Sequence, residues 1–108
     1  MISRETLLKM EFRLEEDHKY QIKAHSVFLC HFFTDITVPN KITRLLEGKH
    51  TVEDFLVAKK MQLPYRDEPS LVTLVQAANA FRLAWVRKML DGASIEDAFH
   101  QTVKEFKP

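Results

Sequence analysis

A chain of 108 residues has the usual length of one domain and can bury a hydrophobic core, so we expect a single domain over residues 1–108 that folds without a metal or a disulfide. The content of 45% apolar and 29% charged residues excludes an intrinsically disordered chain. The balance of 16 basic against 15 acidic residues excludes a strong overall attraction to nucleic acid or anionic lipid.

Cys30 is the single cysteine, so no intramolecular disulfide can form, which suits a reducing compartment. The N-terminus lacks the pattern of a signal peptide, and no stretch approaches the roughly 18 apolar residues of a membrane span. The expected location is the cytoplasm. Gly48 and Gly92 are the only glycines, which excludes glycine-rich nucleotide-binding loops and favours helices over a sheet with many turns.

The N-terminal third of the chain allows two interpretations. Apolar and polar residues alternate over residues 8–14 and again over 20–24, which is typical of a β-hairpin at about residues 8–25. The connection over residues 15–19 contains no Gly, Pro or Asn, and strong helix formers dominate the segment. We therefore prefer a helix and keep the hairpin as the alternative.

Three segments in the first half of the chain are expected to be helical or buried. The apolar run over residues 27–33 is expected to be buried in either fold. Asn40 is a suitable cap for a short helix over residues 41–47, which Gly48 would end. Thr51 begins a capping pattern that predicts a further helix to about residue 62.

The second half of the chain predicts two helices with clear ends. The Asp-Glu-Pro-Ser cluster at 67–70 precedes a long helix over residues 71–90, and Gly92 follows its end. Ser94 then caps a last helix over residues 95–106, in which apolar residues recur at helical spacing. The predicted fold is all-α, with four to five helices around the helix at 71–90. The alternative is an α+β fold with the N-terminal hairpin.

The long helix has an unusually wide apolar arc. At 100° per residue, the apolar side chains from residue 71 to residue 90 cover about 200° of its circumference. Arg82 lies near the middle of this arc, with Asn79 about 60° away. A guanidinium there must extend to solvent, pair with an internal carboxylate, or meet another chain. We therefore name Arg82, Trp85 and Asn79 as candidate binding residues, because Trp and Arg recur at binding hot spots.

Three carboxylate–histidine pairs have the i,i+3 spacing seen in metal sites of helical bundles: Glu15 with His18, Glu47 with His50, and Asp97 with His100. Such a site also needs buried glutamates on further helices, and no such position stands out in the sequence. We therefore expect surface pairs and predict no metal site, cofactor or catalytic residue.

Two helix–turn–helix arrangements bear on DNA binding. In such motifs the first turn of the second helix approaches the DNA. Here those turns carry Glu53 and Asp54 in one case, and Glu96 and Asp97 in the other, which phosphate would repel.

By elimination, the sequence favours a small non-enzymatic protein-binding module, such as an accessory subunit, adaptor, inhibitor or other regulator. Its partner would be a protein, with a homodimer left open. A nucleic-acid-associated regulator and a carboxylate–histidine metal-dependent enzyme are the alternatives.

Overall fold

The computed structural model describes residues 2–20, 25–34, 39–49, 51–58 and 68–107. These residues form six α-helices and one 3₁₀ turn, and no strand occurs among them: α1 (Arg4–Leu14), η1 (Glu15–Asp17), α2 (Ser26–Thr34), α3 (Pro39–Leu46), α4 (Val52–Ala58), α5 (Glu68–Leu90) and α6 (Ile95–Phe106). The prediction of an all-α fold is confirmed.

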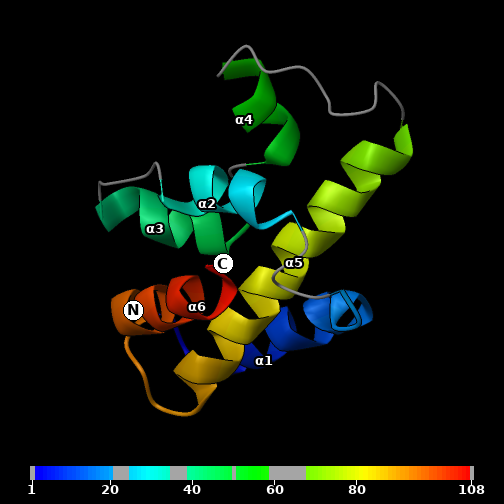
Figure 1. Ribbon diagram of the computed structural model, residues 1–108. Coiled ribbons are helices and arrows are strands. Elements are labelled where there is room, and N and C mark those ends of the chain that lie inside the picture. Colours follow the sequence, from blue (N-terminus) through cyan, green and yellow to red (C-terminus); the bar gives the residue numbers. More distant parts are fainter. Residues whose placement is uncertain (1, 21–24, 35–38, 50, 59–67, 108) are drawn as a thin grey trace.

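The long helix α5 is the central element, as its wide apolar arc predicts. It runs diagonally through the molecule, with α1 on one side and α2, α3 and α6 on the other (Figure 1). Ala77 and Ala80, on the more polar side of α5, are also buried, so neighbouring elements cover it over much of its circumference. Contacts within the chain therefore account for most of the apolar arc, and Val72 and Val75 in the first half of α5 are the exposed part of it.

The core is rich in aromatic side chains that join α2, α5 and α6. Phe33 of α2 stacks on Phe81 of α5, with ring centroids 3.9 Å apart. Phe106 of α6 meets the same Phe81 ring edge-on at 5.1 Å. These three residues are fully buried.

Side-chain caps fix the starts of three helices. Ser3, Thr51 and Ser94 each accept a hydrogen bond from the backbone N–H three residues later, at 3.2, 3.0 and 3.1 Å. Each bond satisfies one of the donors that the first turn of a helix leaves without a partner. The predicted caps at Thr51 and Ser94 are confirmed.

The two glycines end α3 and α5 in the same way. Gly48 and Gly92 have φ values of +78° and +113°, which are strained for residues with a side chain. After Gly48, Lys49 N donates to the carbonyl of Arg44, and after Gly92, Ala93 N donates to the carbonyl of Lys88. This is the Schellman arrangement, in which the chain reverses and the last carbonyls of the helix are satisfied.

The alternative with an N-terminal hairpin is wrong for the residues that the structure describes. Residues 8–14, the expected first strand, lie in α1, and η1 continues the helical path. The local structure here follows from the strong helix formers and the lack of turn residues in this sequence. It does not follow the alternation of apolar and polar residues. Residues 21–24 of the expected second strand lie outside the described residues.

The helix boundaries show smaller differences. The third helix begins at Pro39, so Asn40 lies inside it and is not its cap. The proline at the first position suits a helix start, because its fixed φ is helical and its missing N–H would have no partner there. The fourth helix is described as far as Ala58, and the expected continuation to about residue 62 lies outside the described residues.

Candidate functional site

Arg82 is held inside the molecule by contacts with other parts of the chain. Its side chain is 6% exposed, and its Nε donates to the carbonyl oxygen of Leu45 at 2.8 Å. The guanidinium carbon also lies 5.8 Å and 5.7 Å from the ring centroids of Phe32 and Phe33. Burial removes water from the charged group and lowers the pKa of Arg82 to about 10, so it remains charged at neutral pH.

Asn79 links Arg82 to the N-terminal segment. Its Oδ1 accepts a hydrogen bond from Arg82 Nη1 at 3.0 Å, while its Nδ2 donates to Asp17 Oδ2 at 3.0 Å. Together with the bond to Leu45, this network connects α3, α5 and η1. Asn79 and Arg82 also line a cavity of about 230 Å³ that reaches Arg13 and Glu47.

Trp85 lies in the core. It is fully buried, and its Nε1 donates to the carbonyl oxygen of Ile95 at 2.9 Å, which satisfies the indole N–H. Its ring lies 4.9 Å from that of Phe99. Each of the three predicted binding residues therefore has an intramolecular partner, and the structure brings Arg82 and Asn79 together but keeps Trp85 in a separate contact.

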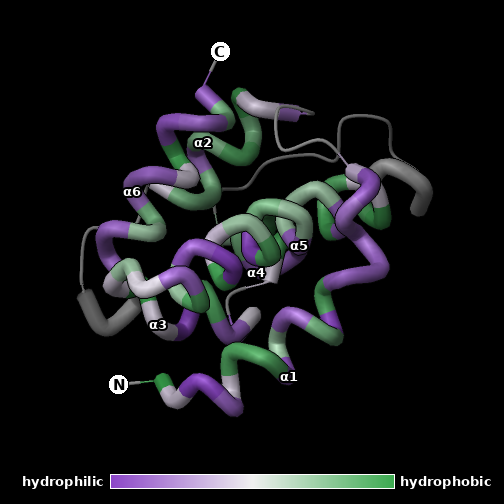
Figure 2. The backbone as a smooth tube through the Cα atoms, turned by 90° about the horizontal axis from the view of Figure 1, so that it is seen from below, coloured by the Kyte–Doolittle hydropathy of each residue, from purple (hydrophilic) through white to green (hydrophobic). Residues whose placement is uncertain are grey.

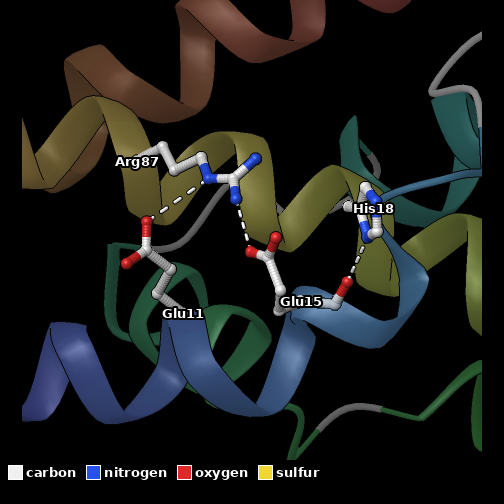
Figure 3. Close-up of polar contacts among 4 residues, drawn as sticks. All are labelled: Glu11, Glu15, His18 and Arg87. Carbon is white, nitrogen blue, oxygen red and sulfur yellow. Dashed lines mark hydrogen bonds and ion pairs between the residues drawn. The ribbon is translucent and has the colours of Figure 1, made fainter.

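Arg87 joins α5 to α1 and to η1 by one ion pair each. Its Nε lies 3.3 Å from Glu11 Oε2, and its Nη2 contacts Glu15 Oε2 (Figure 3). The three side chains are between about a third and a half exposed. The arrangement holds α1 along α5 at the surface.

In two of the predicted carboxylate–histidine pairs, the carboxylate contacts a basic side chain other than the histidine. The Glu15 carboxylate meets Arg87, while His18 Nδ1 contacts the backbone carbonyl of Glu15 (Figure 3). Glu47 pairs with Lys49 at 3.1 Å, and its expected partner His50 lies outside the described residues.

The His100 ring lies 5.5 Å from that of Phe99, and its side chain is exposed. Within the described ranges, no three His, Cys, Asp or Glu side chains converge on a point where they could hold a metal ion.

The basic side chains at the end of α5 are also matched by acids. Arg87 has its two glutamates, and Lys88 Nζ lies 3.0 Å from Glu105 Oε1. The acidic first turns of α4 and α6 are present as expected, with Glu53, Asp54, Glu96 and Asp97. These elements give phosphate no concentrated positive surface in the part of the chain described.

Sequence reasoning missed the most exposed apolar surface. Phe12 is 83% exposed and Leu8, one turn earlier, is 46% exposed. Charged residues surround them on the same side of α1, and we call this set the outer face of α1: Glu5, Leu8, Lys9, Phe12, Arg13 and, in the following 3₁₀ turn, Glu16. A shallow depression, open to solvent, lies over the α1 part of this face and is bordered by Thr6 as well. In Figure 2, α1 runs along the edge of the molecule.

A signal for this surface was present in the sequence. On a strand, Leu8, Met10, Phe12 and Leu14 would share one face, but on a helix they separate into two sets. Leu8 and Phe12 point to one side, while Met10 and Leu14 point to roughly the opposite side and pack in or against the core. A helix over these residues therefore predicts two apolar faces on opposite sides, and only one of them can pack on the core.

Comparison with protein-family models, curated proteins and solved structures gives no match for this chain. In the segments that the structure describes, no helix has the length and apolar character that crossing a membrane requires.

Proposed function

We propose that the protein is a small non-enzymatic protein-binding module that docks a helical partner on the outer face of α1. The observation that supports this proposal best is the exposure of Phe12, at 83% on a regular helix. Leu8 and Phe12 are spaced i,i+4 on one side of α1, the spacing with which helices present apolar anchors to each other.

The charged residues around these side chains suit a protein interface. Glu5 and Lys9 form an ion pair at 3.6 Å, with side chains 80% and 74% exposed. Mixed charges around an apolar centre are typical of protein interfaces, whereas a nucleic-acid interface needs an excess of positive charge. The outer face of α1 is balanced, with Lys9 and Arg13 against Glu5 and Glu16.

This surface differs from the one that the sequence suggested. Arg82 and Trp85 are buried, so a partner could touch them only after the domain opens. Asn79 is partly exposed, and its contact with a partner stays a prediction. Phe12 needs no such opening, which is why the proposal places the contact on α1.

The test compares two substitutions of exposed apolar residues. Partners are captured from extracts of cells that make the protein, with the wild type, Phe12→Ser and Val27→Ser as baits. Each captured protein is then purified, and its affinity for the wild type and for each variant is measured by calorimetric titration. Val27 lies on α2 and is 69% exposed, so it controls for a general loss of surface hydrophobicity. We expect Phe12→Ser to weaken the affinity about tenfold or more and Val27→Ser to change it less than about twofold. Equal affinities for Phe12→Ser and wild type would contradict the proposal.

A further inference from the structure

The outer face of α1 carries its charges at positions that complement a second copy of itself. Lys9 and Glu16 lie two helical turns apart on this face, with Phe12 roughly midway between them. Both Glu16 and Arg13 are exposed, and neither makes an ion pair with any residue that the structure describes. Lys9 has only the exposed contact with Glu5. These charges are therefore available to a partner.

We infer that the occupant of the outer face is a second copy of this chain, packed with its α1 antiparallel to the first. This inference rests on the proposed docking role of the same face. In an antiparallel helix pair, positions with the same sum face each other, and 9 and 16 have the same sum as 12 and 13. An axis beside Phe12 therefore places Lys9 opposite Glu16 of the other copy, and twofold symmetry repeats this contact.

The same register brings the two Phe12 side chains together. The two Phe12 rings lie on either side of the twofold axis, offset along the helix direction by about one residue rise. Arg13 of each copy then lies beside Phe12 of the other copy, where a guanidinium can stack on an aromatic ring. One arrangement therefore allows all three kinds of contact: apolar between the Phe12 rings, ionic between Lys9 and Glu16, and cation–π between Arg13 and Phe12.

The size of the face sets the expected strength of this association. Stable interfaces usually involve about 20 to 30 residues on each side, and the outer face of α1 supplies far fewer. The dimer should therefore be weak, dissociating in the micromolar to millimolar range, and its population should depend on concentration.

Sedimentation velocity over about 10 µM to 1 mM tests the inference with charge-reversed variants of the full chain. Wild type should show a sedimentation coefficient that rises with concentration. Lys9→Glu and Glu16→Lys should each weaken self-association about tenfold or more, because each places like charges opposite one another twice. The double variant Lys9→Glu/Glu16→Lys should recover it, and an equimolar mixture of the two single variants should associate although each alone does not.

Recovery is the decisive outcome, because damage to folding would not be repaired by a second charge reversal. A wild type that is monomeric throughout, or association unchanged by either single reversal, would overturn the inference. So would a double variant that stays monomeric. If wild type is monomeric while Phe12→Ser still loses a different captured protein, the second-copy inference fails and the docking role of α1 stands. If wild type does not self-associate and Phe12→Ser loses no captured protein, both the second-copy inference and the docking role fail.

Discussion

Arg82 donates a hydrogen bond from Nη1 to Oδ1 of Asn79, which lies 3.0 Å away and one turn earlier on α5. The amide of Asn79 is fixed in turn by its bond to Asp17, so its oxygen is oriented toward the guanidinium. The charge near the middle of the apolar arc is thus held by groups from α3, α5 and η1. Arg82 therefore connects helices within the fold.

The first prediction concerns the stability of Arg82→Ala. The substitution removes the donors for the Leu45 carbonyl and the Asn79 amide oxygen and leaves a cavity. We expect the free energy of unfolding to fall by about 2 to 5 kcal/mol. Urea denaturation can be followed by the fluorescence of Trp85, which is the only tryptophan and is buried. Arg13→Ala, an exposed control, should change stability by less than about 0.5 kcal/mol. A loss below about 1 kcal/mol for Arg82→Ala would show that the guanidinium is not buried in this network.

The second prediction concerns the pH dependence of that loss. Burial lowers the pKa of Arg82 to about 10 in the folded state, below its ordinary value in the unfolded chain. Between about pH 6 and pH 9 both states keep the proton, so the difference in unfolding free energy between wild type and Arg82→Ala should be constant. Above the folded-state pKa, the folded protein loses its proton first. The unfolded chain then binds more protons, and the contribution of Arg82 to wild-type stability should rise with pH. Parallel urea titrations at both pH values check the constant range, and a loss that shrinks markedly toward pH 9 would contradict it.

Much of the fold follows from local signals in the sequence. The caps at Thr51 and Ser94 and the glycines at 48 and 92 each act within a few residues, so they could be recognised without knowing the tertiary structure. The central position of α5 was also predictable, because an apolar arc of about 200° has to be covered from several directions.

The site was harder to predict because its contacts join distant parts of the chain. Arg82 meets Leu45, and Asn79 meets Asp17, across 37 and 62 residues of sequence. Periodicity places Arg82 on an apolar arc. It does not distinguish an internal partner, solvent or a second chain as the group that the guanidinium contacts. The exposure of Phe12 is harder to see for a different reason. Alternation over residues 8–14 is typical of a strand, whereas on a helix the same spacing puts Leu8 and Phe12 opposite Met10 and Leu14.

The third prediction concerns the ion pairs that Arg87 of α5 makes with α1 and η1. Arg87→Ala removes the contacts with Glu11 and Glu15, which are partly exposed to water and therefore screened. We expect a loss of less than about 1 kcal/mol at low salt and a smaller one at about 1 M salt. Thermal melts of wild type and Arg87→Ala at the two salt concentrations measure this. A loss above about 2 kcal/mol that persists in high salt would mean that the pairs are shielded from solvent.

The last prediction compares two phenylalanines in different surroundings. Phe12 is 83% exposed on α1, whereas Phe33 is fully buried against Phe81. Serine and phenylalanine have similar helix propensities, so Phe12→Ser mainly tests burial, and we expect stability to change by less than about 0.5 kcal/mol. Phe33→Ala should cost about 3 to 5 kcal/mol, because it leaves a cavity between α2 and α5. Urea denaturation at low protein concentration, where self-association through α1 is negligible, measures both values. A cost above about 2 kcal/mol for Phe12→Ser under these conditions would show that another part of the chain covers this face, and the docking surface on α1 would then be occupied from within.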